Sequence, residues 1–260
     1  MWWSNLFVDM NKANFFNFSF LPKYATSFVR GLEYTLLLAV VSVLLAIIPA
    51  LLLALMRLSK NRFVRGISGA YIAVFRSTPL LVQLSIIYFG LFQFINLPRY
   101  LLFGFIAINR FVPGVVALAL NSSAYVAEIF RAGIQSIPQG QYEAASSLGM
   151  SYVQTMFTII LPQTVRRVIP TVTSDFITSF KDTSLLSSVG VMELMMFSKN
   201  LTTVSGNITP YVAAGIFYLI VTLPLIKVVS IVENRIARSE RGEGPRPKAK
   251  AQLKEAADVQ

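Results

Sequence analysis

Long apolar runs dominate the sequence, and short polar and basic stretches separate them. A run of about 20 apolar residues forms a helix long enough to cross the hydrocarbon core of a bilayer, which is roughly 30 Å thick. No short apolar core with a basic start precedes the first run, so we interpret it as a retained helix and not as a signal peptide. The pattern predicts an all-α polytopic membrane protein with about five transmembrane helices, at residues 35–56, 79–95, 112–134, 168–189 and 211–232.

The second of these helices is predicted to begin before its cleanest apolar run. Residues 67–78 are less uniformly apolar, and Pro79 removes a backbone N–H donor where the two parts meet. We therefore expect a kinked second span over residues 67–95. An odd number of spans places the two ends of the chain on opposite sides of the membrane.

Basic residues predict the orientation of the spans, because Lys and Arg are retained on the cytoplasmic side of a membrane. If the N-terminus lies outside, fifteen basic residues face the cytoplasm and six face the outer side, while Arg76 and Lys181 fall within spans. We therefore expect the N-terminus outside and the C-terminus in the cytoplasm. The predicted regions are an outer-side N-terminal interfacial segment (1–33), a transmembrane domain (34–234) and a cytoplasmic polar tail (235–260).

The composition of the chain excludes most types of enzyme active site. The chain is 55% hydrophobic and 13% charged, and it contains neither Cys nor His, which excludes disulfides, Cys/His metal sites and His-dependent catalytic triads. It also lacks a G-x-x-x-x-G-K-[ST] phosphate loop, so we expect no metal, no cofactor and no catalytic residue on this chain. The net charge of +11 predicts orientation and not nucleic-acid binding, since the basic residues lie mainly at the ends of apolar runs.

The longest predicted cytoplasmic connection has the pattern of a short helix on the membrane surface. Ser136 and Gln139 have the spacing of a capping box, and Pro138 lies in the first turn, where its missing N–H costs little. We expect a helix over about 138–149, with Gly149 as its stop. The apolar face of this helix would consist of Tyr142, Ala145 and Leu148.

A second helix is predicted directly after the first one in the same connection. It would run over residues 151–160, and Leu161-Pro162 is expected to break it before the next span. The short surface helix would then be held at both ends.

This connection resembles the EAA loop of ABC importer permeases. The residues that match the spacing of that motif are Glu143-Ala144-Ala145, Gly149, Ile159 and Leu161-Pro162. Three further blocks make the chain similar, more narrowly, to the polar amino-acid permeases, the branch that includes histidine, arginine, glutamine and cystine importers. These blocks are FRSTPLLVQL (75–84), NSSAYVAEIFRAGIQSIPQGQ (121–141) and KDTSL (181–185), and the similarity covers about residues 25–235.

The resemblance implies the type I ABC importer permease fold, in which the EAA helix is a coupling helix. Such a helix sits in a groove of a separate ATPase subunit and transmits the closing motion of the ATPase dimer. Small alanines allow close approach, Glu143 offers a carboxylate to a basic partner, and Gly149 permits a sharp turn. An interfacial helix without a partner is the alternative. The residues expected to couple to the ATPase are Glu143, Ala144, Ala145, Leu148 and Gly149.

The resemblance also implies the partners and the location of the chain. ATP and Mg would bind to the ATPase subunit dimer, and a second permease subunit, identical or paralogous, would complete the channel in a bacterial plasma (inner) membrane. An extracytoplasmic amino-acid-binding protein would contact the outer loops 96–109 and 194–209, and membrane lipids would surround the spans.

Two predicted spans carry polar side chains along one face. Asn121, Tyr125 and Glu128 share a face of the third span, because they lie four and three residues apart. The fourth span has a similar stripe. Because polar groups at membrane depth usually face the interior of a bundle, we expect both stripes to line a substrate pathway. Its candidate residues are Asn121, Ser122, Tyr125, Glu128, Asp175, Thr178, Asp182 and Ser184.

A structural role is the alternative for these charges. Lys181 could pair with Asp182, Asp175 or Glu128 and hold the helices in register. Arg76 could steady a carboxylate, but we expect it to anchor the start of the kinked span at the headgroups.

Three function classes remain open on the residues alone. The first is an ABC importer permease for a cationic or zwitterionic polar amino acid, driven by an ATPase on another chain. The second is an ion-coupled secondary amino-acid carrier with Glu128 and Asp175 as ion sites, although such carriers usually show two related halves. The third is an intramembrane hydrolase that pairs Lys181 with Ser184 or Ser187, but no G-x-S-x-G accompanies them.

Overall fold

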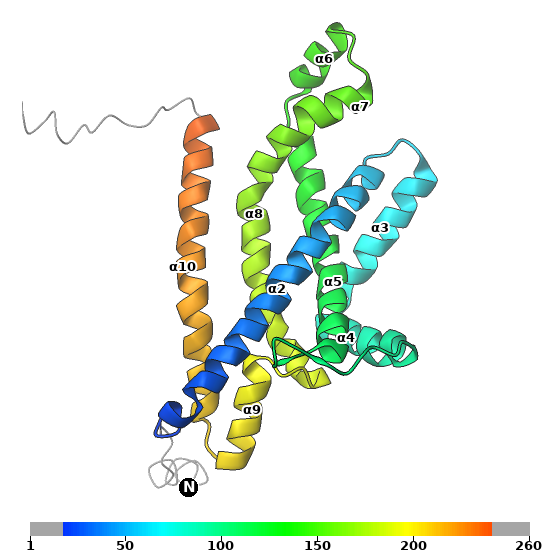
Figure 1. The fold of residues 1–260 in the computed structure, drawn as a ribbon. Coiled ribbons are helices and arrows are strands. Elements are labelled where there is room, and N and C mark those ends of the chain that lie inside the picture. The colour runs from blue at the N-terminus through cyan, green and yellow to red at the C-terminus, as the bar shows by residue number, and fades with distance from the viewer. Residues whose placement is uncertain (1–17, 241–260) are drawn as a thin grey trace, which may run out of the picture.

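The computed structural model describes residues 18–240, which form an elongated bundle of helices (Figure 1). The last thirteen residues of the predicted N-terminal segment belong to the first long helix, whereas residues 1–17 and the tail from 241 lie outside the described residues. The elements are α2 (Leu21–Arg57), α3 (Arg62–Ser77), α4 (Leu80–Ser85), η2 (Ile86–Leu91), η3 (Phe92–Phe94), β1 (Leu101–Leu102), β2 (Ile106–Ala107), α5 (Ile108–Gln135), α6 (Gln139–Ser147), α7 (Tyr152–Thr155), η4 (Met156–Ile160), α8 (Leu161–Asp182), η5 (Thr183–Val189), α9 (Leu194–Ser205) and α10 (Thr209–Glu240).

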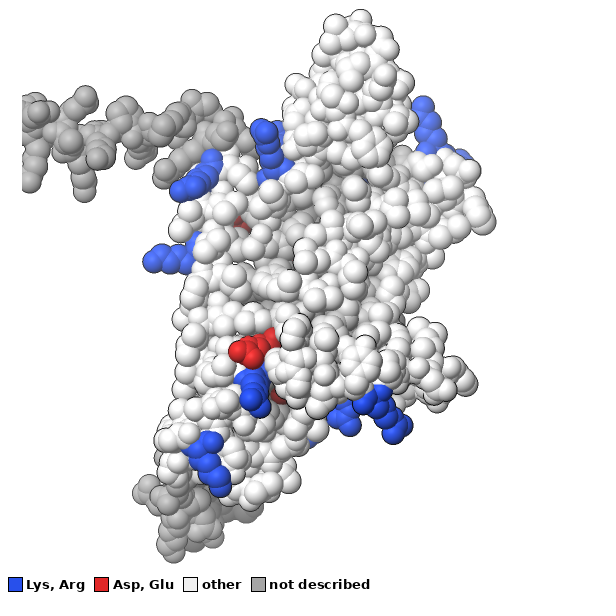
Figure 2. Space-filling view, viewed as in Figure 1, with Lys and Arg blue, Asp and Glu red and all other residues white. Residues whose placement is uncertain are grey.

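Three helices in the described part of the chain are long and apolar enough to cross a membrane by themselves: α2, α5 and α10. Helix α8 runs along α5 through the bundle but carries more polar residues (Figure 1). The face drawn in Figure 2 has a largely uncharged middle, with a small group of acidic and basic side chains within it. The fold is therefore helical and suited to a membrane, while the count of five spans stays a prediction.

The predicted second span is broken, not merely kinked. Helices Arg62–Ser77 and Leu80–Phe94 meet at 106°. Together they are long and apolar enough for one membrane span, but this span would be broken at the bend. Pro79 has an extended backbone conformation and is the N-cap of α4. The expectation of one continuous kinked helix was wrong, because the chain turns almost perpendicular to α3 at this point.

Gln83 supplies the hydrogen bonds that stabilise this break. Its Nε2 donates to the carbonyl oxygen of Phe75 at 2.8 Å, to that of Thr78 at 3.0 Å and to the Thr78 hydroxyl at 2.8 Å. Its Oε1 accepts a hydrogen bond of 2.8 Å from Asn121 Nδ2 on α5. A broken helix leaves carbonyl groups without helical partners, and an unpaired polar group in hydrocarbon is costly. One buried amide therefore satisfies the break and ties it to α5.

The core of the bundle is the contact between α2 and α5. Helix α2 presents Ala39, Ala46, Ala50 and Ala54 on its buried face, all of them fully buried. Small side chains at helical spacing let two helices approach closely in a membrane. Larger residues pack on either side of this seam, in one cluster around Tyr34, Leu38, Leu118 and Leu186 and in another around Ile72, Val126, Phe130 and Val168.

The surface helix α6 forms as predicted, but its first turn differs from the prediction. Its N-cap is Pro138, without a side-chain cap, and the Ser136 hydroxyl instead donates to the carbonyl oxygen of Gly133 at 2.7 Å. The predicted capping box was therefore wrong. Gly149 follows the helix with a φ of +74°, a left-handed conformation that favours glycine, so its role as a stop is confirmed.

The predicted break at Pro162 does not occur. Helices α7, η4 and α8 follow one another without a gap, and Pro162 lies in the first turn of α8. The preceding π-helical turn, Met156–Ile160, changes the backbone hydrogen-bonding pattern just before the proline, whose missing N–H is tolerated in a first turn. A capping box does form in this region, at the start of α7, between Ser151 and Gln154.

Glu193 is a buried carboxylate that links α9, α10 and α2, at a place distant from α6. It was not among the residues predicted from the sequence. Glu193 has no exposed surface and caps α9 by accepting from the N–H groups of Met195 (2.8 Å) and Met196 (2.7 Å). The Tyr218 hydroxyl of α10 donates to it at 3.2 Å, and the next residue, Leu194, donates its N–H to the Thr35 hydroxyl of α2. Burial raises the pKa of Glu193 to about 7, against the opposing effect of the Met195 and Met196 N–H groups.

We expect this carboxylate to make stability depend on pH. Because the folded state keeps the Glu193 proton up to about pH 7, its stabilising contribution is full below the ordinary pKa of 4.5 and disappears as the pH rises through 7. The total change is on the order of 3 kcal/mol. Thermal unfolding in detergent from about pH 5 to about pH 8 should show wild type losing stability relative to Glu193→Gln. The exposed Glu233→Gln is the matched control; parallel wild-type and Glu193→Gln profiles would contradict this role.

Candidate functional site

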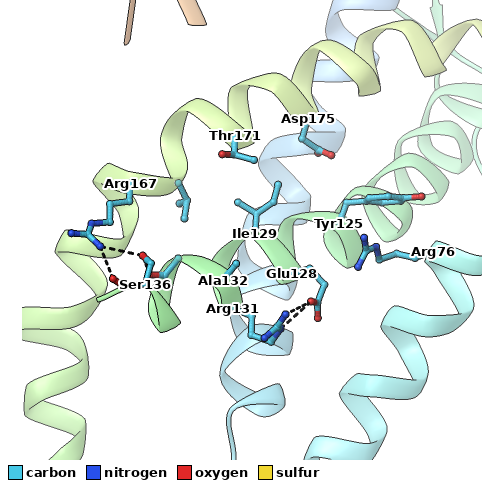
Figure 3. A pocket seen from close by; sticks show the side chains of 12 residues that line it. Arg76, Tyr125, Glu128, Ile129, Arg131, Ala132, Ser136, Arg167, Thr171 and Asp175 are labelled. Atoms are coloured by element: carbon cyan, nitrogen blue, oxygen red, sulfur yellow. Dashed lines mark hydrogen bonds and ion pairs between the residues drawn. The ribbon is translucent and has the colours of Figure 1, made fainter. Parts of the chain in front are cut away.

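A cavity of ≈ 540 Å³ opens between α5, α8 and the end of α3 (Figure 3). Of the predicted pathway residues, Tyr125, Glu128 and Asp175 lie on its wall. Both polar stripes therefore contribute to one cavity, as the helical spacing predicted. Its lining consists of Arg76, Tyr125, Glu128, Ile129, Arg131, Ala132, Gly133, Ser136, Arg167, Val168, Thr171 and Asp175.

A smaller cavity of ≈ 150 Å³ adjoins the first one, because Tyr125 and Asp175 line both. Six of the eight predicted pathway residues line this smaller cavity. Ser184 lies in the following 3-10 helix and lines neither cavity, and Thr78 at the helix break is an addition that the prediction lacked. The lining residues are Thr78, Leu80, Asn121, Ser122, Tyr125, Asp175, Thr178, Ser179 and Asp182.

Asp175 is the acidic group at the junction of the two cavities. The hydroxyl of Ser122 on α5 donates to its Oδ2 at 2.8 Å. Its Oδ1 makes no hydrogen bond with the part of the chain that the structure describes. One carboxylate oxygen thus fixes the side chain between the helices, while the other can accept a hydrogen bond from a ligand.

Glu128 is already neutralised by a neighbour on its own helix. Arg131 donates to its Oε2 from Nε at 2.9 Å and from Nη2 at 2.8 Å (Figure 3). This is the ion pair that the described side chains form, so the alternative in which Lys181 pairs with Asp182, Asp175 or Glu128 is not what the structure shows. Arg131 also donates from Nη1 to Gln135 at 2.6 Å. Lys181 is exposed in the structure. The two arginine contacts make Glu128 a weaker candidate than Asp175 for a free cation.

Arg76 is positioned differently from the headgroup anchor that we expected. Its guanidinium lies over the ring of Tyr125, 5.3 Å from the ring centroid, and it lines the larger cavity (Figure 3). A cation over an aromatic face is attracted by the ring quadrupole. Its place on the cavity wall is compatible with the other role considered for Arg76, a contact with a carboxylate.

Asn121 has a structural partner as well as a place in the smaller cavity. Its amide nitrogen donates to Gln83, which holds the break between α3 and α4. The sequence-based prediction missed Gln83, and the available signal was an amide side chain four residues after Pro79 in an otherwise largely apolar run. In the described part of the chain, no cluster of three or more acidic side chains could hold a metal ion.

The predicted coupling residues lie on α6 and, for Leu148 and Gly149, in the turn that ends it; α6 projects beyond the bundle at one end, opposite α9 (Figure 1). Ala145 is buried, whereas Leu148 is 79% exposed. Glu143, Ala144 and Gly149 are also exposed. The predicted apolar face of α6 is therefore split: Ala145 packs inward, and Leu148 remains open to a partner.

Comparison with known proteins gives the chain its family. Residues 42–238 match the family described as "Binding-protein-dependent transport system inner membrane component". The L-cystine transport system permease protein TcyB of Bacillus subtilis (strain 168) is 38% identical over 80% of this chain and 86% of its own length. The arginine transport system permease protein ArtQ of the same organism is 36% identical, over 82% and 93% respectively.

The fold agrees with these sequence relatives. A chain from the crystal structure of an amino acid ABC transporter with histidines superimposes with a TM-score of 0.74 at 38% identity, covering 84% of this chain and 98% of that one. A chain of the MetNI methionine ABC transporter, at 19% identity and a TM-score of 0.64, shares the fold. The protein therefore belongs to the family of inner membrane components of binding-protein-dependent transport systems, and it is a permease subunit of an ABC importer and not an enzyme.

Proposed function

We propose that this permease carries a cationic or zwitterionic polar amino acid through the two adjoining cavities between α5 and α8. The observation that carries the proposal is Asp175, held by Ser122 at the junction of both cavities, with its second oxygen accepting no hydrogen bond from the described residues. The cargoes named for the relatives, cystine, arginine and glutamine, are polar amino acids and support the same substrate class.

The chemistry of the walls suits the two ends of an amino acid. Asp175 and Asp182 would attract an ammonium group in the smaller cavity, where Ser122 and Thr178 add hydroxyls. Arg76 would attract a carboxylate from the larger cavity. Charge-assisted hydrogen bonds of this kind are stronger than neutral ones, so a few contacts can orient a small ligand. Asn121 would act mainly through Gln83, as part of the wall.

Helix α6 is our candidate for the coupling helix. Glu143, Ala144, Leu148 and Gly149 are exposed at the end of the molecule, as a docking element requires, while Ala145 anchors α6 to the bundle. ATP and Mg would bind to a separate ATPase subunit dimer, whose closing motion α6 would receive.

The remaining partners follow from this arrangement. A second permease subunit would complete the channel, and an extracytoplasmic amino-acid-binding protein would contact the outer loops 96–109 and 194–209. The end of α10 lies at the same end of the bundle as α6, and the start of α2 lies at the opposite end, which supports a cytoplasmic C-terminus and an outer N-terminus (Figure 1). The permease domain would comprise residues 34–234, with 235–260 as a cytoplasmic tail.

Reconstitution tests the energy source directly. We expect uptake of a polar amino acid into proteoliposomes only when the chain is combined with its ATPase, its binding protein and ATP. The ion-coupled carrier, which the family membership does not favour, predicts uptake by the chain alone along a proton or sodium gradient. Such uptake would overturn the proposal.

Asp175→Asn tests the pathway. Removing the charge at the cavity junction should raise the KM for a cationic amino acid about 10- to 100-fold, the size of one lost charge-assisted contact, and change the KM for a neutral one less. Initial uptake rates at varied substrate concentration give both values. Glu233→Gln, an exposed position on α10, removes the same charge and should leave KM unchanged; an unchanged KM in Asp175→Asn would exclude Asp175 from the pathway.

Glu143→Arg tests α6. A reversed charge on the exposed face should repel a basic partner side chain, so ATP hydrolysis should no longer respond to the binding protein and substrate, although the subunits still assemble. ATPase rates with and without loaded binding protein measure this response. Glu233→Arg makes the same charge change elsewhere and should keep the response. Normal stimulation in Glu143→Arg would remove this residue from coupling.

A further inference from the structure

Gly133, on the wall of the larger cavity, brings α5 and α8 into unusually close contact. A Cβ atom at this position would lie 2.3 Å from Val168 Cγ1 and 3.0 Å from Thr164 Cγ2, distances at which neighbouring atoms must move. Both of these neighbours are buried, and the Thr164 hydroxyl is fixed by a hydrogen bond to the Ile160 carbonyl oxygen. Residue 133 therefore sets the minimum separation of the two helices that carry the polar stripes.

The contact at Gly133 is part of the wall of the larger cavity, near the end of α5 that leads into α6. On the cavity side, Ile129 and Glu128 come within one and a half turns. On the other side, Ser136 is the C-cap of α5 and stands only two residues before Pro138, the N-cap of α6. Displacement of α6 can therefore reach the cavity wall directly through this short segment, since Gly133 and Ser136 line the cavity.

That short segment is also linked directly to α8. Arg167 Nη1 donates to the Ser136 carbonyl oxygen at 2.7 Å and to its hydroxyl at 3.2 Å (Figure 3). The intervening Ile137 is 4% exposed and packs in the cluster of Ile134 and Met156. The segment that connects α5 to α6 is therefore packed in the core and hydrogen-bonded to both α5 and α8.

From this geometry we infer that Gly133 is the pivot about which α5 and α8 change their angle when α6 is displaced, with the Arg167–Ser136 contact as the link that drives the rotation. A glycine at a helix crossing has no side chain interdigitated with the opposite helix, so the helices can rotate without a rotamer change. The inference rests on the proposed function of α6 as coupling helix. It assigns Gly133, Val168 and Arg167 positioning roles and no contact with the nucleotide.

A compensating pair of substitutions tests the pivot in the reconstituted complete transporter. Gly133→Ala should push α8 away from α5: kcat for ATP-driven uptake should fall at least about fivefold and ATP consumed per amino acid should rise, while KM stays within about twofold. Adding Val168→Ala removes the methyl group that a Cβ would meet, so the double variant should regain most of the kcat and the ATP ratio. A purely structural role would reduce the amount of assembled transporter and leave the ATP ratio per active complex unchanged.

Each outcome of these measurements either supports or overturns the role of Gly133 as the pivot. If Gly133→Ala does not assemble, recovery of assembly and uptake in Gly133→Ala/Val168→Ala supports the close contact, and no recovery overturns the inference. Wild-type kcat and ATP ratio in Gly133→Ala would overturn it as well. Arg167→Gln should uncouple ATP hydrolysis from uptake with little change in KM. Normal coupling in this variant would contradict the proposed role of the Arg167–Ser136 contact. Failure of the wild-type transporter to import any polar amino acid would instead refute the proposed function.

Discussion

Polar groups inside a bilayer have no water to bind, so they must find partners within the protein. In this chain α5 supplies those partners to its neighbours. Asn121 binds Gln83 at the break before α4, Ser123 binds the Tyr71 hydroxyl of α3 at 2.8 Å, and Ser122 binds Asp175 of α8. Three consecutive residues on one helix thus hold three other segments. These contacts connect the helices that line the two adjoining cavities.

The same polar groups that hold the helices also give the cavities their character. Asp175 is fixed by one oxygen and available through the other, and Arg76 is held over Tyr125 on the opposite wall. A purely apolar bundle could pack as well, but it would offer a polar substrate no hydrogen bonds to replace those that the substrate makes with water. Family membership as an ABC importer permease and the polar interior therefore both agree with the proposed pathway, which the contacts that assemble the bundle would also line.

The sequence predicted much of this fold and less of the site geometry. Apolar run length identified the long helices, and helical spacing brought six of eight pathway residues to one cavity, because both follow from periodicity within single elements. Contacts between elements were not predictable in this way. The ion pair of Glu128 is the exception, because Arg131 lies three residues later on the same helix and this spacing could have identified it as the partner. The 106° break, the continuous helix through Pro162 and the buried Glu193 depend on neighbours that only tertiary packing supplies.

The central claim is that the polar faces of α5 and α8 bound a water-filled pathway, and cysteine accessibility tests it most directly, since the chain contains no cysteine. Thr171→Cys lies on the cavity wall, and Ile169→Cys lies on the same helix, exposed but outside the cavity lining. In the reconstituted transporter, a charged maleimide should label position 171 rapidly, the transported amino acid should slow that labelling, and position 169 should remain unreactive. Equal labelling of both positions, or no labelling at 171, would contradict the claim.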